Sequence, residues 1–237
     1  MLLGGCGDGG GATGEPDPTA TVTSVASVAS VTSVVSAPVA STTSAPVAPE
    51  VDDVPPVPDG PATALVDALV VAQPSSPGEY RRDAFGPGWS YDPETGCNTR
   101  EVVLAEESGP GLVVGDRCKP LVGSWTSTYD GMVTSDPADL EIDHVVPLAE
   151  AWRTGAAAWT ADRREVFAND LDDPGTLAAV STRSNRSKQD STPAQWLPDD
   201  DAARCRFVAD WVRIKARWDL TVAPDEKVAI TQVLAGC

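Results

Sequence analysis

The chain contains a single histidine, His144, and an aspartate stands directly before it. An imidazole exchanges a proton near neutral pH, so a histidine can activate a water molecule for hydrolysis. Asp143 offers carboxylate oxygens, and Asn185, in the stretch SNRSKQD, offers an amide oxygen. Hard divalent cations bind such oxygens; Mg²⁺ is the ion we expect, and Mn²⁺ and Ca²⁺ accept similar ligands. These residue types suit metal-assisted hydrolysis of a phosphodiester, with His144 as the base and Asp143 and Asn185 as metal ligands.

The elements expected around these residues decide between a catalytic and a merely packed histidine. Residues 140–146 alternate around the Asp-His pair, which predicts a strand, and the apolar run 177–180 predicts a second strand. Ser181, or the threonine after it, can cap a short helix that carries Asn185. The order strand, strand, helix would bring the acid, the imidazole and the amide together. This arrangement favours a catalytic role for His144.

The remaining elements predict an α+β fold with further helices. Two helical stretches are expected within residues 148–168, and Pro224 can begin a last helix. The clearest helix is expected over residues 201–218, where large apolar residues recur at helical spacing. This apolar stripe, which we expect in the core, consists of Phe207, Trp211, Ile214 and Trp218.

Several segments match a known pattern, namely IDHVVPLAEAWRTGAAAW, FANDL, LAAVSTRSNRSKQD and PAQWLP. In them the chain resembles the His-Me finger nucleases, and in particular the HNH endonuclease family proteins found as the C-terminal domain of GmrSD restriction enzymes. The segments EYRRDAFGPGW, GCNTR and YDG resemble exported members, so the resemblance covers residues 79–220. It implies a ββα-metal (His-Me finger) core, with Asp143 and Asn185 binding the metal and His144 activating water.

One position departs from this pattern. Many HNH sequences place an asparagine nine residues before the metal-binding asparagine, where it braces the loop that bears the histidine. Thr176 occupies that position here. We expect Asn169, in FANDL, or a backbone group to brace the loop instead.

Basic residues near Asn185 are candidates for contacts to phosphate. Arg186 and Lys188 follow Asn185 on the same short helix, and Arg100, in GCNTR, is a further candidate. Arginine and lysine form charge-assisted hydrogen bonds to phosphate oxygens, and such bonds position a nucleic-acid backbone.

The chain as a whole is strongly acidic, because 35 Asp and Glu against 17 Lys and Arg give a formal charge of −18. This acidity argues against long-range, nonspecific attraction to nucleic acid, but it does not exclude a local basic groove. One candidate groove is formed by Arg183, Arg186 and Lys188. The other comprises five residues, which could equally form an ordinary solvated helix face: Arg204, Arg206, Arg213, Lys215 and Arg217.

The amino-terminal part differs in composition from the rest. Residues 1–6, MLLGGC, resemble the end of a truncated lipoprotein signal, a lipobox at which Cys6 would be lipidated; a chance match is the alternative. Residues 7–62 are rich in Ser, Thr, Pro, Val and Ala, which predicts a disordered linker before a domain over residues 63–237. No later run of 18 apolar residues predicts a transmembrane helix. We expect an extracytoplasmic protein, either lipid-anchored to the outer face of a bacterial cell membrane or secreted.

Four further cysteines form no CxxC pair, and one histidine cannot complete a Cys/His zinc site. An even number of cysteines in an exported chain predicts two disulfides, whereas reduced, buried cysteines are the alternative. Of the three possible pairings we expect that of nearest neighbours, Cys97 with Cys118 and Cys205 with Cys237.

Two functions from different classes fit these residues. The first is an exported, lipid-anchored, metal-dependent endonuclease that acts as a monomer on DNA or RNA, with DNA the expected substrate. The second is a noncatalytic cell-envelope lipoprotein that retains the nuclease fold and binds a wall polymer or a partner. The intact set of Asp143, His144 and Asn185 favours the first.

Overall fold

The computed structural model describes residues 54–75 and 78–237. Its helices are α1 (Ala62–Ala68), α2 (Thr99–Glu106), α3 (Leu148–Thr154), α4 (Ala161–Ala168), α5 (Thr182–Lys188), α6 (Asp201–Arg217) and α7 (Pro224–Leu234). Short 3₁₀ helices are η2 (Arg82–Phe85), η3 (Asp116–Cys118), η4 (Pro137–Asp139) and η5 (Ala156–Ala158). The strands pair antiparallel, β1 (Val113–Val114) with β2 (Pro120–Val122), β3 (Trp125–Thr126) with β4 (Val133–Thr134), and β5 (Leu140–His144) with β6 (Leu177–Ser181). This mixture confirms the predicted α+β class.

The predicted lipobox with Cys6, and most of the predicted linker over residues 7–62, lie outside the described residues. Helix α1 begins at Ala62, beside the expected start of the domain. Packing extends further upstream, because the carbonyl of Pro55 accepts a hydrogen bond of 2.6 Å from Nε of Arg217 in α6. None of the helices in the described ranges has the length and apolar character that crossing a membrane requires.

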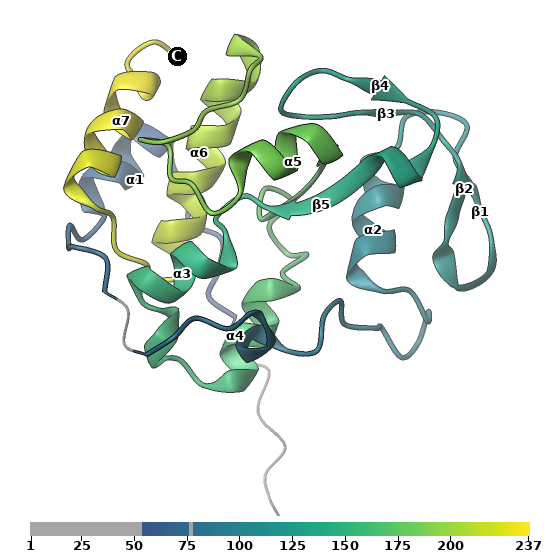
Figure 1. Ribbon diagram of the computed structural model, residues 1–237, viewed down its shortest axis with the longest axis horizontal. Helices are drawn as coiled ribbons and strands as arrows, with labels where there is room; N and C mark the ends of the chain where they lie inside the picture. The colour runs from purple at the N-terminus through teal and green to yellow at the C-terminus, as the bar shows by residue number, and fades with distance from the viewer. Residues whose placement is uncertain (1–53, 76–77) are drawn as a thin grey trace, which may run out of the picture. The chain divides into compact units, whose positions relative to one another are not determined.

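The predicted order of strand, strand and helix is present in β5, β6 and α5. Strands β5 and β6 pair in register from Leu140 opposite Ser181 to His144 opposite Leu177. Helix α5 follows β6 directly and packs on both strands, as Figure 1 shows. Its N-cap is Ser181, whose Oγ accepts a hydrogen bond of 3.1 Å from the backbone N–H of Ser184.

The two strands lie between two apolar clusters. Successive strand residues point to opposite faces, so Ile142 and Ala179 join a cluster with Trp125, whereas Ala178 and Val180 join the main core. The main core is built on α6, whose predicted stripe is buried, with exposed fractions of 3% or less. Helices α1 and α7 cover α6 on the side away from the small sheets (Figure 1).

Both expected disulfides are present. One joins Cys97, just before α2, to Cys118 in the β1–β2 turn. The other joins Cys205 in α6 to Cys237, which follows α7. The predicted pairing of nearest neighbours is therefore confirmed, and each bond closes a loop that would otherwise add entropy to the unfolded chain.

Three of the five residues of the second basic cluster, Arg213, Lys215 and Arg217, form internal ion pairs, whereas the more exposed side chains of Arg204 and Arg206 pair with Asp201 and Asp210. Arg213 bonds Asp173 and Asp210, both at 2.7 Å. Arg217 bonds Asp170 at 2.9 Å. These guanidinium groups neutralise acids of the core and its rim, so this part of α6 is not the basic surface that we considered from the sequence.

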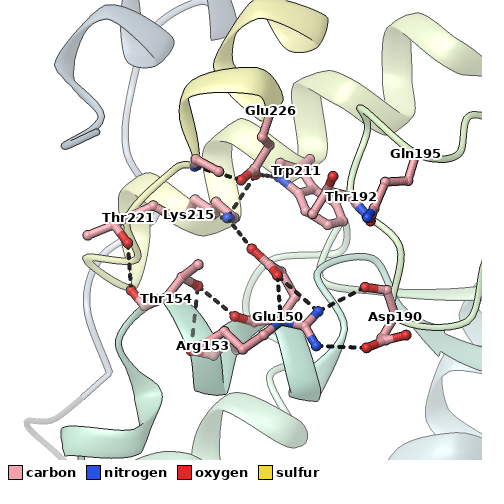
Figure 2. A network of polar contacts seen from close by, with 12 residues as sticks. Glu150, Arg153, Thr154, Asp190, Thr192, Gln195, Trp211, Lys215, Thr221 and Glu226 are labelled. Atoms are coloured by element: carbon pink, nitrogen blue, oxygen red, sulfur yellow. Dashed lines mark hydrogen bonds and ion pairs between the residues drawn. The ribbon is translucent and has the colours of Figure 1, made fainter. Parts of the chain in front are cut away.

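Lys215 is the centre of a buried polar network that joins α3, α6 and α7 (Figure 2). Its ammonium contacts Glu150 Oε1 at 2.9 Å, Glu226 Oε1 at 2.8 Å and the carbonyl of Thr221 at 2.9 Å. Trp211 donates a further hydrogen bond of 2.6 Å to Glu226. Each buried charge therefore has a partner, which is the condition for keeping such groups in a core.

Glu150 extends this network toward the site. Arg153, three residues further along α3, bonds Glu150 at 3.1 Å and Asp190 at 2.7 Å. Asp190 lies just beyond the end of α5. Helix α3 is thus held both to the main core and to the end of α5, the helix that carries Asn185 (Figure 2).

Replacing Lys215 by methionine is expected to destabilise the fold strongly. The change leaves Glu150 and Glu226 buried without their cation, and removing one partner of a buried ion pair costs about 3–5 kcal/mol. Chemical denaturation of Lys215→Met and of Lys119→Met, which alters an exposed lysine, measures the difference. Equal free energies of unfolding for the two variants would contradict the structural role of the network.

Glu107, which bonds the backbone of β6, makes the stability of the fold depend on pH. The carboxylate of Glu107 accepts hydrogen bonds of 3.2 Å from the N–H of Ala179. Burial raises the pKa of Glu107 from the usual 4.5 to about 7, although the Ala179 bond opposes the shift. The folded state therefore binds the proton of Glu107 more tightly than the unfolded state does. Ionisation of Glu107 lowers the free energy of unfolding, and this loss is complete above about pH 7. Below the pKa that Glu107 has in the unfolded chain, the loss is absent.

Glu107→Gln, which mimics the protonated acid, is expected to raise the free energy of unfolding at alkaline pH by about 1–3 kcal/mol. The gain should shrink as the pH falls and should be lost near the unfolded pKa. Denaturation of wild type and variant across this pH range measures it, and Glu106→Gln, at the exposed neighbouring acid, is the control. A gain independent of pH would exclude titration of Glu107 as its cause.

Candidate active site

His144 is the last residue of β5, and the position of its ring is fixed by two contacts. Its Nε2 lies 2.9 Å from the carbonyl oxygen of Ala168, at the end of α4, and must carry the proton to bond there. The indole of Trp89 stacks on the ring, with centroids 5.4 Å apart and planes 12° from parallel. Nδ1 is therefore the nitrogen with a free lone pair, as a general base requires.

The protonation state of His144 suits a base. Burial lowers its pKa to about 3, the hydrogen bond to Ala168 opposes this shift, and the positive charges of Arg82 and Lys188 add to it. The imidazole is therefore neutral at physiological pH. The sequence left open which carbonyl orients the ring, and the structure identifies that of Ala168.

The loop that bears Ala168 is braced through its next two residues. Asn169 Oδ1 accepts hydrogen bonds from the N–H of Ser90, at 2.8 Å, and from the hydroxyl of Thr99, at 2.7 Å. Asp170 accepts a bond of 3.0 Å from the hydroxyl of Thr176, in addition to its ion pair with α6. Asn169 thus braces the loop as we expected, and Thr176 contributes through Asp170.

Asp143 is buried and paired. The ammonium of Lys188 contacts its two oxygens at 2.8 and 3.1 Å, and the hydroxyl of Tyr129 donates to Oδ2 at 2.7 Å. Lys188 also donates to the carbonyl of His144 at 3.0 Å. Burial raises the pKa of Asp143, and the charge of Lys188 together with the two donors opposes that shift and favours the carboxylate.

Asn185 lies on α5 with its amide orientation set by Glu141. The amide nitrogen donates to Glu141 Oε2 at 2.7 Å, which leaves the carbonyl Oδ1 free for another contact. Glu141 stands two residues before Asp143, so both point to the same face of β5. The side chain of Arg186, which is 75% exposed, also contacts Glu141, at 3.3 Å.

A hollow of about 550 Å³ connects the three residues predicted from the sequence, and we call it the Asn185 hollow. Asp143, His144 and Asn185 all line it, together with Arg82 and Asp190. His144 is only 5% exposed, but it is among the residues that line the hollow. The three residues singled out from the sequence therefore border one space.

Two residues of the Asn185 hollow, Asp143 and Asn185, carry oxygen donors of the type that a divalent cation binds, and both oxygens of Asp143 already contact Lys188. Across the described residues no group of three His, Cys, Asp or Glu side chains gathers as a metal site. A cation in the Asn185 hollow would be held by Asp143 and by Oδ1 of Asn185, with water completing its shell. Mg²⁺ commonly keeps several waters and uses one or two protein ligands beside phosphate.

The three candidate phosphate contacts take different positions. Arg186 lines the Asn185 hollow. Lys188 is fully buried and paired with Asp143, not on the helix surface as the sequence had indicated. Arg100 donates to the carbonyl of Pro137 at 3.2 Å, so it fixes the start of β5. Of the three, only Arg186 reaches the hollow.

The motif YDG contributes residues that the sequence did not assign. Tyr129 bonds Asp143, and Asp130 accepts hydrogen bonds from Ser181 and Ser184 at the start of α5. Burial favours a higher pKa for Asp130, but the bonds from Ser127, Ser181 and Ser184 outweigh it and lower the pKa to about 2. This turn therefore ties the Asp-His strand to the Asn185 helix. In the sequence, YDG stood out only as a segment that resembles exported members of the family, without a role for its residues.

The pair of Asp143 and Lys188 gives a test that does not depend on activity. Lys188→Met is expected to lower the free energy of unfolding by about 3–5 kcal/mol, because Asp143 is left buried without its cation. Adding Asp143→Asn to Lys188→Met should recover much of this loss, because it removes the unpaired charge. Strictly additive losses in the double variant would show that the two groups do not interact.

Comparison with known proteins places this geometry in context. The family model described as GmrSD restriction endonucleases, C-terminal domain, matches residues 117–233. An uncharacterized secreted protein of Arthroderma benhamiae is 40% identical over 176 residues, which cover 74% of this chain and 84% of the relative. No solved structure matches the chain.

Proposed function

Because the chain belongs to the family of the GmrSD restriction endonuclease C-terminal domain, we propose that it is an exported, metal-dependent endonuclease that hydrolyses phosphodiester bonds of nucleic acid. One observation carries the proposal. The hydrogen bond from Nε2 to Ala168 leaves Nδ1 of His144 as a proton acceptor beside a hollow that Asp143 and Asn185 also line.

In this mechanism His144 removes a proton from the attacking water through Nδ1. The carbonyl of Ala168 stabilises the imidazolium that forms, because it already accepts the Nε2 proton. Asp143 and Asn185 would hold a divalent cation, which would supply neutralisation of the negative charge on the phosphate. The charge of Lys188 opposes the rise in the pKa of Asp143 that burial causes, and Glu141 accepts the amide N–H of Asn185, which leaves its carbonyl oxygen as the donor to a cation.

Export is supported by two observations. Both disulfides suit an oxidising compartment, and the relative in Arthroderma benhamiae is described as secreted. We extend the proposal to a lipid anchor at Cys6, to a monomer, and to DNA as the substrate before RNA. Mg²⁺ is the proposed ion, with Mn²⁺ and Ca²⁺ as substitutes.

Nuclease activity is tested with the full chain, its disulfides formed, on supercoiled plasmid and on RNA. We expect cleavage in Mg²⁺, none in excess chelator, and recovery when Mg²⁺ is restored. His144→Ala should slow cleavage by about 10²–10⁴-fold, because general base catalysis contributes roughly that factor. Gel assays under single-turnover conditions measure these rates.

The matched variants for the metal ligand are Asp143→Asn and Asp225→Asn. Asp225 is exposed on α7, so its loss should leave cleavage unchanged, whereas loss of Asp143 should abolish it. Cleavage that survives His144→Ala or chelation would contradict this mechanism. Absence of cleavage of every DNA and RNA substrate would favour the noncatalytic envelope lipoprotein.

A further inference from the structure

A second hollow lies on the other side of His144. It has a volume of about 450 Å³, and we call it the Trp89 hollow. Trp89, His144 and Ala168 line it, together with Arg82 and Leu148. His144, Arg82 and Leu148 also line the Asn185 hollow, so the two spaces adjoin at these side chains.

Arg82 projects from a rigid base. It begins η2, and Phe85 at the end of that turn is 2% exposed and packs against the ring of Phe167, with centroids 6.2 Å apart. The carbonyl of Ala84 accepts a hydrogen bond of 2.8 Å from Arg164 in α4. The backbone beneath Arg82 is thus fixed to the same helix that ends in Ala168.

The ion pairs around the two hollows leave Arg82 without an internal counter-ion. Arg81 forms an ion pair with Asp83, at 2.6 Å, and Arg186 forms one with Glu141, at 3.3 Å. Within the described ranges, no carboxylate lies at salt-bridge distance from Arg82, although its side chain is exposed beside the site. An arginine beside a general base, with no carboxylate partner among the described residues, can present its fork of donors to a planar or tetrahedral oxyanion.

We propose that Arg82 binds a phosphate of the nucleic-acid strand, and that the strand crosses His144 from the Asn185 hollow into the Trp89 hollow. The Trp89 hollow then holds the nucleotide next to the scissile phosphate. Its volume lies within the range of small-ligand sites, and Trp89 and Leu148 give it an apolar wall. Arg82 and Trp89 precede the matched range 117–233, so the match to the family model does not assign them.

This inference rests on the proposed nuclease function and adds the residue that holds the substrate. It also explains how an acidic chain can bind a polyanion. Because attraction at long range is weak, binding must depend on a few close contacts, and a single guanidinium at the site can dominate them.

The experiment compares Arg82→Ala with Arg81→Ala, each in the full chain carrying His144→Ala so that the probe is not cut. Arg81 is the matched control, because it is an adjacent exposed arginine that bonds Asp83. The probes are fluorescein-labelled DNA single strand, DNA duplex and RNA of one sequence. Fluorescence anisotropy in Mg²⁺ and in chelator, over a series of KCl concentrations, gives the dissociation constant Kd.

We expect Arg82→Ala to raise Kd about tenfold for the preferred probe, and Arg81→Ala to change it less than about twofold. The slope of log Kd against log salt should fall by about 0.7–0.9 for Arg82→Ala, the value for one lost phosphate contact. Arg82→Lys should give an intermediate Kd, because it keeps the charge but not the fork of donors. The unfolding midpoint should stay unchanged, because Arg82 is exposed and contributes no internal ion pair.

Equal effects of Arg82→Ala and Arg81→Ala, an unchanged salt slope, or no binding of any probe would overturn the role of Arg82. The outcome is separable from that of the proposed function. If wild type cleaves but Arg82→Ala binds normally, only the Arg82 site is rejected. If Arg82→Ala alone weakens binding but wild type cleaves nothing, the site stands as a nucleic-acid site and the nuclease proposal fails.

Discussion

The geometry of the site depends on one hydrogen bond, from Nε2 of His144 to the carbonyl of Ala168. A backbone carbonyl cannot change its orientation unless its peptide moves, so it fixes both the ring and its tautomer. The peptide in turn is held through the two residues that follow Ala168, because Asn169 bonds Thr99 in α2 and Asp170 bonds Arg217 in α6. Helices far apart in the chain therefore set the direction of a single lone pair.

The small number of basic residues limits where positive charge can lie in this protein. A chain with 35 acids and 17 bases has few cations to spare, and most bases of α6 pair with acids of the core. Such internal pairs keep buried carboxylates ionised without leaving a basic surface. The cations that line the Asn185 hollow are Arg82, which has no ion pair among the described residues, and Arg186, which pairs with Glu141. Recognition of a polyanion must therefore be local.

The local parts of the fold could be predicted from the sequence. Alternation predicted β5, an apolar run predicted β6, helical spacing predicted α6, and Ser181 was one of two candidate caps for α5. The candidate residues Asp143, His144 and Asn185 could be predicted because two paired strands and the helix that follows them lie close together. Helix α2 was harder to predict, because a single short turn of valines at 102–103 has no clear period.

What the sequence could not give were contacts between segments far apart in the chain. Lys188 looked like a surface charge on a short helix, but it is buried because α5 packs on β5 and Asp143 requires a counter-ion. Glu141 was not assigned, because only the pairing of its carboxylate with Asn185 reveals its role. The role of Ala168 could not be predicted, because it contacts His144 through a backbone carbonyl, and every residue has one.

The pairing of Asp143 has a consequence for how the proposed site assembles. A carboxylate that already accepts bonds from Lys188 and Tyr129 has fewer lone pairs left for a cation than a free one. Mg²⁺ sites with few protein ligands commonly obtain further oxygens from water and from substrate phosphate. A phosphate held by Arg82 would thus complete the ligand set as well as position the scissile bond. Because Lys188 keeps the acid in place without any metal, the protein side of the site is already arranged before ion and strand arrive, and their binding is expected to be mutually dependent.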